Sequence, residues 1–503
     1  MVASPLKRLL VQTSHYSVAS LLTMIGGLVS FPILTRVFSV ADYGIMNLVA
    51  ATLTVSVALG KIGVQHSILR YASEIGAGKS AYSMSQLTST TLYGMAASAL
   101  AVTVVIALGA EVVPGRWLGD PRVRGLFLIA SLLIVVQVIE SALTNFLRAE
   151  QRTTTLMKFQ VAKKYLSLGF ILLAVLAISR TLTAFYTASV ISEGLAVAAL
   201  AWVFFRSTSR QRPSPSQFSR PLYKELIRFG IPMLIGYELS GIVLAVGDRY
   251  VIEGLMGETP LGLYSAAYNL CQYVQAVFIA SVGQAIMPMY MQMWDEKGAP
   301  ETEAFIARSL RSYVLFGAPV VAGVAAVGPE LLPSLASDKY ASASLVLPWV
   351  IAGMVVDGTN SIVGAGLFIH RKTRIIMTIV LGGALLNLAL NLILVPRIGI
   401  VGAAIATLIS YTGTALSMAI AGRHLLRIAL PWSTILRAGI ASALMYAAVA
   451  PLLPGRHFLA VGVRAALGAL IYAVVMMLID PDARALGRKV LGRLRSRSTG
   501  GQA

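Results

Sequence analysis

The most constraining feature of this chain is a run of thirty-six residues, Thr259 to Trp294, that contains no Asp, Glu, Lys or Arg. A bilayer core about 30 Å thick is crossed by about 20 apolar residues in a helix. Thirty-six residues would form about 54 Å of helix, so the run is expected to combine an outer loop with one long helix over 261–288. About fourteen apolar segments occur along the chain, which predicts an all-α integral membrane protein.

The composition agrees with a membrane protein and argues against most other classes. The 503 residues are 57% hydrophobic and 12% charged, with a mean hydropathy of +0.77. The single cysteine, Cys271, excludes a disulfide framework, and the five histidines lack the spacing of a metal site. No catalytic motif is present, and no loop is long enough for a catalytic domain. We therefore expect a protein that is not an enzyme, with no catalytic residue, no metal and no cofactor.

The net charge of +20 fits either nucleic-acid binding or an excess of basic residues on the cytoplasmic side of a membrane. If the N-terminus is inside, 29 Lys and Arg fall in cytoplasmic segments, Lys163 and Lys164 among them, and 9 fall in outer segments. This bias predicts both termini inside and no nucleic-acid partner. The predicted spans are 14–36, 43–66, 85–108, 125–147, 160–179, 183–205, 228–248, 261–288, 311–332, 345–369, 375–395, 398–420, 433–453 and 458–479.

The two halves of the chain share an order of residues that indicates an internal repeat. Arg36 and the pair Tyr43-Gly44 correspond to Arg249 and the stretch Gly262–Tyr264. Parallel repeats are typical of transporters that rock two bundles about a central site. The predicted division is an N-terminal six-helix bundle (1–206), a cytoplasmic linker (207–227), a C-terminal six-helix bundle (228–422), and two extra helices with a basic cytoplasmic tail (423–503).

Four acidic residues lie within predicted spans, where an ionised side chain is unfavourable unless it is paired or hydrated. One explanation is an ion pair with a neighbouring base or a position at the interface. The other is a proton or cation site, or a contact with substrate hydroxyl groups. The candidates for ion coupling, by H⁺ or Na⁺, are Glu238, Asp357, Glu140 and Glu193.

Basic residues in or near the spans also have two explanations. Lys61 either snorkels to the inner interface or faces a cavity, whereas Arg464 is expected to snorkel outward. Arg36 and Arg249 occupy equivalent repeat positions, so they either anchor the outer interface or bind a diphosphate in forked geometry from two lobes.

The charge-free run carries polar and aromatic residues that suit a cavity better than lipid. Tyr268, Asn269 and Gln272 are candidates for contact with sugar rings or hydroxyl groups. An interfacial aromatic belt is the alternative explanation for the tyrosines of this region.

Three stretches, 31–45 (FPILTRVFSVADYGI), 261–268 (LGLYSAAY) and 391–410 (NLILVPRIGIVGAAIATLIS), resemble the polysaccharide transporter family. These proteins are O-unit or oligosaccharide flippases of the multidrug/oligosaccharidyl-lipid/polysaccharide exporter superfamily. The resemblance implies two six-helix bundles and two C-terminal helices around a cavity that opens to alternate faces. It also implies cationic cavity residues, which we assign to Arg36, Lys61 and Arg249.

The implied substrate is an undecaprenyl-diphosphate-linked oligosaccharide, moved from the cytoplasmic to the periplasmic leaflet of a bacterial inner membrane. Such transport serves the synthesis of O-antigen, capsule or exopolysaccharide. The implied partners are membrane lipids, a polysaccharide polymerase and chain-length machinery. A cation-coupled multidrug antiporter and a lipid II flippase of the same superfamily remain alternatives. A membrane-embedded polysaccharide polymerase or ligase is a further alternative from another class.

Overall fold

The computed structural model describes residues 5–112, 122–207, 213–278, 280–452, 458–481 and 484. Within these ranges the chain is helical and contains no β-strand, and twelve helices are long and apolar enough to cross a membrane. The predicted class, an all-α membrane protein that crosses the bilayer many times, is therefore confirmed. Residues 208–212 of the predicted linker and 485–503 of the predicted tail lie outside the described residues.

The chain forms two compact units, Met1–Ser265 with Ile376–Ala403, and Ala266–Ile375 with Ala404–Ala503. These limits do not coincide with the bundles 1–206 and 228–422, whose relation as repeats stays a prediction. The first unit contains α1 (Pro5–Val37), α2 (Val40–Lys61), α3 (Val64–Gly76), α4 (Met84–Val112), α5 (Arg122–Ala149), α6 (Thr153–Leu173), α7 (Leu182–Ser207), α8 (Arg220–Met233) and α9 (Ser240–Met256). The second contains α11 (Ala280–Lys297), α12 (Ala299–Leu335), α13 (Leu347–Asp357), α14 (Asn360–Val363), α15 (Ala365–Ile369), α17 (Trp432–Val449) and α18 (Phe458–Ile479).

Two helices run from one unit into the other and account for the remaining predicted spans. The first, α10 (Glu258–Phe278), is followed by α11, and together they cover the predicted span 261–288. Because α10 begins at Glu258, the start of the charge-free run is helical, and the outer loop expected there is wrong. The second, α16 (Thr373–Gly422), is broken at Ile398 and Gly399, which have non-helical dihedral angles. The break separates the predicted spans 375–395 and 398–420, so the helix count is consistent with about fourteen.

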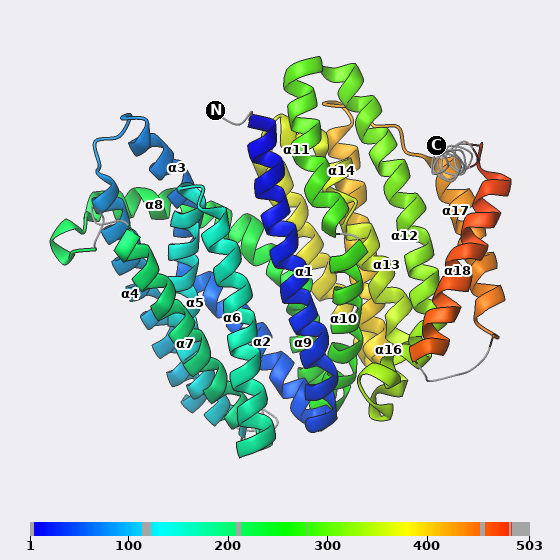
Figure 1. Ribbon diagram of the computed structural model, residues 1–503, viewed down its shortest axis with the longest axis horizontal. Helices are drawn as coiled ribbons and strands as arrows, with labels where there is room; N and C mark the ends of the chain where they lie inside the picture. The colour runs from blue at the N-terminus through cyan, green and yellow to red at the C-terminus, as the bar shows by residue number, and fades with distance from the viewer. Residues whose placement is uncertain are drawn as a thin grey trace, which may run out of the picture. The chain divides into compact units, whose positions relative to one another are not determined.

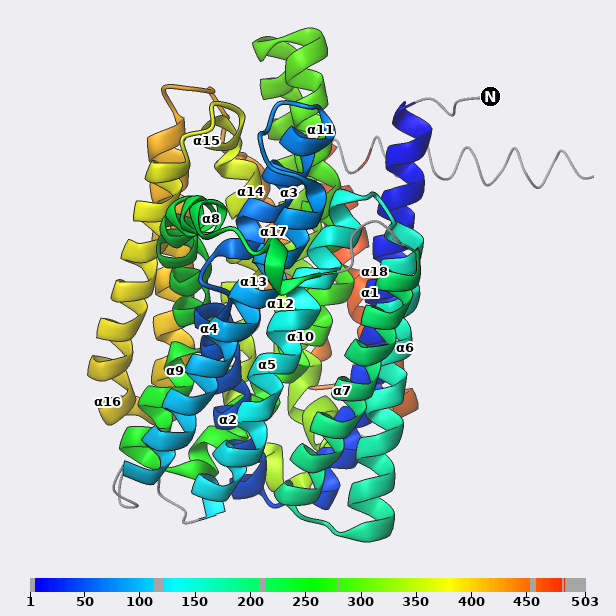
Figure 2. The ribbon, with the colours of Figure 1, turned by 90° about the vertical axis from the view of Figure 1, so that its left-hand side faces the viewer.

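In the first unit, α5 packs against α4 and α7, and α6 packs against α7 and α1 (Figures 1 and 2). α8 lies across these helices, lengthwise in Figure 1 and end-on in Figure 2. Its buried residues Leu222, Leu226 and Gly230 recur every four positions, which gives the helix one apolar face. That face packs against α3, where the Ser67 hydroxyl donates to the Leu226 carbonyl oxygen at 2.9 Å.

The crossing of α3 and α8 depends on two glycines. A Cβ on Gly63 would overlap the Gly230 carbonyl group, and a Cβ on Gly230 would overlap that of Gly63. Gly63 also has φ of 72°, a left-handed conformation that glycine adopts without strain. Between α2 and α3 the chain therefore turns at Ile62 and Gly63, and Lys61 ends α2 at this turn.

Two tyrosine side chains also form hydrogen bonds to α8 close to its crossing with α3. The hydroxyls of Tyr71 and Tyr82 donate to the Glu225 carboxylate at 3.4 and 3.0 Å. Burial raises the pKa of Tyr71, and the hydrogen bond to Glu225 raises the pKa of Tyr82. Both phenols therefore remain protonated donors at neutral pH.

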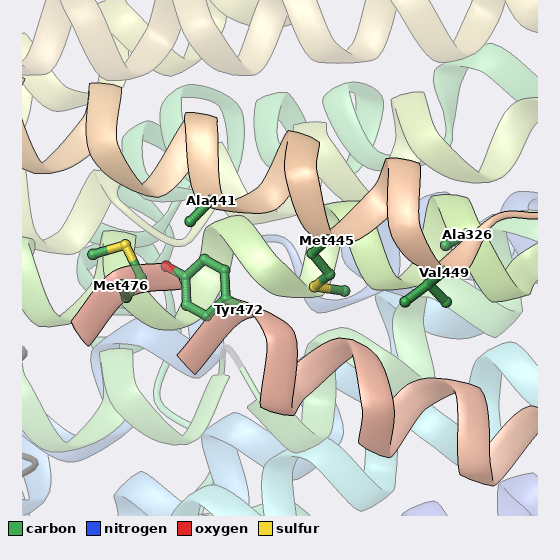
Figure 3. Close-up of a cluster of buried hydrophobic side chains, with 6 residues drawn as sticks. All are labelled: Ala326, Ala441, Met445, Val449, Tyr472 and Met476. Atoms are coloured by element: carbon green, nitrogen blue, oxygen red, sulfur yellow. The ribbon is translucent and has the colours of Figure 1, made fainter. Parts of the chain in front are cut away.

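In the second unit, α17 and α18 pack on α12 through an apolar cluster. Figure 3 shows Met445 and Val449 of α17 facing Tyr472 and Met476 of α18, with Ala326 of α12 at one end. The Tyr472 hydroxyl donates to the Leu315 carbonyl oxygen at 2.9 Å.

Arg464 of α18 is buried beside this cluster, with 1% of its surface exposed. Its Nη1 lies 2.9 Å from Glu330 Oε1, and its Nη2 donates to the carbonyl oxygens of Ala326, Val449 and Ala450. The expectation that Arg464 snorkels outward is wrong, because inside the protein its guanidinium contacts a carboxylate and a carbonyl oxygen of α12 and two carbonyl oxygens at the end of α17. The interaction also joins the two C-terminal helices to α12.

Candidate functional site

Three charged residues form a triad between α5, α6 and α7 of the first unit. Lys163 Nζ lies 2.6 Å from Glu140 Oε2 and 3.0 Å from Glu193 Oε2. Gln137 Nε2 also donates to Glu193 Oε2 at 3.1 Å. Each of the three charged side chains is less than 20% exposed. Because ions within membrane-spanning helices require partners, the triad explains how both acids are accommodated.

The triad forms one wall of a cavity with a volume of about 450 Å³. The cavity lies between α1, α5, α6 and α7, and all of its lining residues are polar or charged. They are Ser20, Thr23, Glu140, Gln160, Lys163, Lys164, Ser167 and Glu193. Cavities of this size bind small molecules or parts of larger ligands.

Lys163 and Lys164 are candidate functional residues that the sequence analysis does not select. The charge count places both in a cytoplasmic segment, but they lie eleven and twelve positions along α6, a helix within the candidate span Thr153–Ile178. Both residues therefore belong to a helix, and their placement on the cytoplasmic side stays a prediction. The sequence does contain an indication that these lysines are candidates, because both fall within the predicted span 160–179.

A second cluster surrounds Glu238 in the same unit. Lys61 Nζ lies 3.2 Å from Glu238 Oε1, and His66 Nε2 lies 3.0 Å from Glu238 Oε2. The Gln65 amide also donates to Glu238 Oε2. The structure therefore brings together two predicted site residues, Lys61 and Glu238, and adds Gln65 and His66, which the sequence analysis does not select.

Local backbone geometry places both sides of this cluster. After Pro232 the chain forms a π-helix, Leu234–Leu239, which carries Glu238. Such π-helical turns are common at functional sites. On the other side, the turn at Ile62 and Gly63 ends α2 directly after Lys61. Two local departures from regular α-helix therefore lie beside the paired side chains.

Arg36 and Arg249 have different surroundings. Arg36 is exposed near the end of α1 and donates to the Pro32 carbonyl oxygen at 3.1 Å. Arg249 is buried in α9, where its Nη1 lies 3.3 Å from Asp248 Oδ1. The Tyr264 hydroxyl donates to the other oxygen of Asp248. Binding of a diphosphate by the two arginines stays a prediction.

The remaining predicted site residues belong to the second unit. Asp357 ends α13 and accepts a hydrogen bond from Asn360 Nδ2 at 2.9 Å. Among the described residues, no basic side chain lies within ion-pair distance of Asp357. On α10, Tyr268 is 2% exposed, Asn269 is partly buried and Gln272 is exposed. A role for these four residues in transport also stays a prediction.

Comparison with known proteins identifies the family. The profile described as "Polysaccharide biosynthesis protein" matches residues 33–345. The chain is 25% identical over 216 residues to the probable low-salt glycan biosynthesis flippase Agl15 of Haloferax volcanii, covering 43% of this chain and 44% of that protein. It is 24% identical over 346 residues to the succinoglycan biosynthesis transport protein ExoT of Rhizobium meliloti, covering 68% of this chain and 64% of the relative. The chain thus spans less than two thirds of the length of either relative.

The fold is that of a solved transporter. The structure of lipid II flippase MurJ in an inward closed conformation superposes with a TM-score of 0.77 at 14% identity, covering 93% of this chain and 99% of that one. At this identity the likeness establishes the fold. The resemblance found in the sequence is confirmed: the family profile covers more than half of the chain, and this multi-pass membrane protein belongs to the polysaccharide biosynthesis protein family.

Proposed function

We propose that the protein flips an undecaprenyl-diphosphate-linked oligosaccharide from the cytoplasmic to the periplasmic leaflet by alternating access. The supporting observation is the concentration of ionisable and polar side chains within membrane-spanning helices of the first unit. The triad around Lys163 and the cluster around Glu238 place charged groups on helices that are long and apolar enough to cross a membrane. The family and the glycan-related names of the relatives support the same substrate class.

The physical requirement for such a protein is clear. A diphosphate and several sugars would lose their hydration in hydrocarbon, at a cost of several kcal/mol for each unpaired polar group. A hydrated cavity lined by hydroxyl, amide and charged groups replaces those contacts. The polyprenyl chain is apolar and remains in the lipid.

We also propose the membrane in which the protein lies and its orientation there. The protein resides in a bacterial cytoplasmic membrane with both termini inside, as the bias of Lys and Arg predicts. It supplies substrate for O-antigen, capsule or exopolysaccharide synthesis and works beside a polymerase and chain-length machinery. Proton or sodium coupling through Glu238, Asp357, Glu140 or Glu193 belongs to the same proposal.

A reconstituted assay tests this function. Purified protein is incorporated into liposomes that contain a fluorescent undecaprenyl-diphosphate oligosaccharide, and an added glycosidase or quencher reports the exposed leaflet. We expect the protein to make the protected fraction accessible. A protected fraction that stays constant, with protein shown to be folded, would refute the proposal.

Three alternative functions would give different results. A multidrug antiporter would change the drug sensitivity of cells that lack it, without accumulation of lipid-linked oligosaccharide. A lipid II flippase would be required for growth and would move lipid II in the same liposomes. A polymerase or ligase would lengthen or transfer glycan chains in an assay with no membrane barrier.

A further inference from the structure

We propose that the groove between α12 and α17 of the second unit binds a transmembrane helix of another membrane protein, one that presents small residues and a hydrogen-bonding side chain. The groove has a volume of about 640 Å³ and lies on two helices that are long and apolar enough to cross a membrane. This inference goes beyond the proposed function and does not depend on it, because neither the groove nor its test involves the lipid-linked oligosaccharide.

The groove has the length and the residue spacing of a contact between helices. Its lining residues on α12 run from Val314 to Ala325, and those on α17 run from Ile435 to Tyr446. On each helix they occupy positions i, i+4, i+7, i+8 and i+11, which form one stripe along the helix surface. Eleven positions correspond to about 16 Å of helix, or about three turns. Because α12 and α17 pack side by side, their two stripes can accommodate a third helix along this length.

Small residues are frequent in both stripes. Ala318, Ala322 and Ala325 lie on α12, and Gly439 and Ala443 lie on α17. A Cβ added to Gly439 would meet no atom within 4 Å, so the space beside this glycine is open. In membranes small residues let helix backbones approach closely, and they are enriched where helices meet. A lipid chain has no backbone of this kind to bring close, so the small residues favour a helix as the ligand.

The hydroxyl of Ser442 is an independent indication of a ligand that forms hydrogen bonds. Ser442 lines the groove and is only 8% exposed, and its Oγ forms no hydrogen bond with any described residue. A buried hydroxyl without a hydrogen bond is unfavourable. The hydrocarbon chains of lipid cannot satisfy it, whereas a Ser, Thr, Asn or Gln side chain on a partner helix can. The hydroxyl therefore also favours a helix over a lipid chain.

The opposite face of α17 is already occupied within the protein. Ala441, Met445 and Val449 belong to the apolar cluster shown in Figure 3, where α17 packs against α18. Gly439 and Ala443 precede Ala441 and Met445 by two positions, which places them about 200° around the helix. The stripe that lines the groove therefore points away from α18, and both Gly439 and Ala443 are exposed.

The experiment uses a synthetic leucine-rich transmembrane peptide as the probe. One peptide carries glycine and serine residues along one face, and a matched peptide carries leucine at the same positions. Binding to the full chain in liposomes is measured by energy transfer from a dye on S433C, because Ser433 is exposed and the native Cys271 is buried. We expect the glycine and serine peptide to bind about tenfold more tightly than the leucine peptide, the effect of close packing and a hydrogen bond between membrane helices.

Substitutions in the groove make the test specific. G439L fills the open space beside α17 and should abolish the preference for the glycine and serine peptide. G462L is the matched control, because a Cβ at this exposed glycine of α18 also meets no atom within 4 Å and the residue does not line the groove. S442A should weaken binding by about threefold or more, the effect of one hydrogen bond between membrane helices. In the protein alone S442A should melt at or above the wild-type temperature, because it removes an unsatisfied buried hydroxyl.

Three results would overturn the inference. Equal binding of the two peptides to the wild type would leave the groove to lipid. Energy transfer between two labelled copies of the chain that G439L abolishes, without selective binding of either peptide, would assign the groove to a second copy. A lower melting temperature of S442A would show that its hydroxyl has a partner inside the protein and needs no ligand. Melting temperatures also show whether G439L is folded, and S442A tests the groove if it is not.

Discussion

Gly44 and Gly262 bring the first turns of α2 and α10 into direct backbone contact. A methyl group on Gly44 would overlap the Glu258 carbonyl oxygen, and one on Gly262 would overlap the Val40 carbonyl oxygen. These are the two glycines that occupy equivalent positions in the repeat predicted from the sequence. Their contact gives a physical reason for glycine at both positions, since no side chain fits where the two helices meet.

Alanine at either glycine should therefore destabilise the protein. Overpacking of a close contact costs about 1–3 kcal/mol, so we expect G44A and G262A each to lower the melting temperature in detergent. Gly254→Ala is the matched control, because that position has open space around it. It should melt at or above the wild-type temperature. Melting of G44A like the control would show that the contact is not formed.

The break in α16 predicts that alanine has opposite effects on stability at Gly399 and at Gly382. Gly399 has φ of 63° and ψ of −147°, a region that is essentially restricted to glycine. We expect G399A to be destabilised by about 1–3 kcal/mol. Gly382 lies in a regular part of α16, and a Cβ added there would meet no atom within 4 Å, so its replacement by alanine should stabilise the protein by up to about 1 kcal/mol. Denaturant titration in micelles measures both, and equal effects at the two positions would contradict the break.

The break in α16 is also a case in which local sequence is sufficient for a correct prediction. Pro396 and Gly399 lie between two long apolar segments, and the sequence alone therefore separates the two spans correctly. The apolar segments, the acids within them and the family resemblance are recognised in the same way. All of these depend on residues that are close in the chain.

Charged residues within the spans are harder to place, because their environment depends on distant partners. The charge count places Lys163 in a cytoplasmic segment, and nothing in the sequence indicates that Glu140 and Glu193 contact it from two other helices. The position of Arg464 near the start of its span favours snorkelling outward. In the structure Arg464 instead pairs with Glu330, which lies on a helix far earlier in the chain. Counting basic residues along a sequence cannot distinguish a lysine at a helix end from one paired inside a bundle.

The triad around Lys163 should respond asymmetrically to neutralisation. K163Q leaves two carboxylates in one partly buried site without their shared cation, whereas E140Q or E193Q leaves Lys163 with one partner. We therefore expect K163Q to lower the free energy of unfolding by about 2–4 kcal/mol and each glutamine variant by less. Combining K163Q with E140Q should restore part of the loss. Greater destabilisation by E140Q than by K163Q would argue against the shared pairing.

Replacement of Arg464 by lysine should destabilise the protein. Its guanidinium reaches Glu330 and three carbonyl oxygens on two helices at once, and an ammonium group cannot span these acceptors. We expect R464K to loosen α17 and α18 from α12, seen as a lower melting temperature and as new protease cleavage near these helices. Arg427→Lys, at a position between α16 and α17, is the control and should behave like the wild type.

The pair Lys61 and Glu238 can be tested by a double-mutant cycle. E238Q removes the carboxylate that three donors share, and K61Q removes one of those donors. Because the two side chains are partly buried and 3.2 Å apart, we expect a coupling of about 0.5–3 kcal/mol in the free energy of unfolding. The control cycle combines E238Q with K158Q and should be additive within about 0.5 kcal/mol. If the Lys61 cycle is equally additive, the two residues do not interact in the folded protein, and Glu238 then needs another partner to be stable within a membrane-spanning helix.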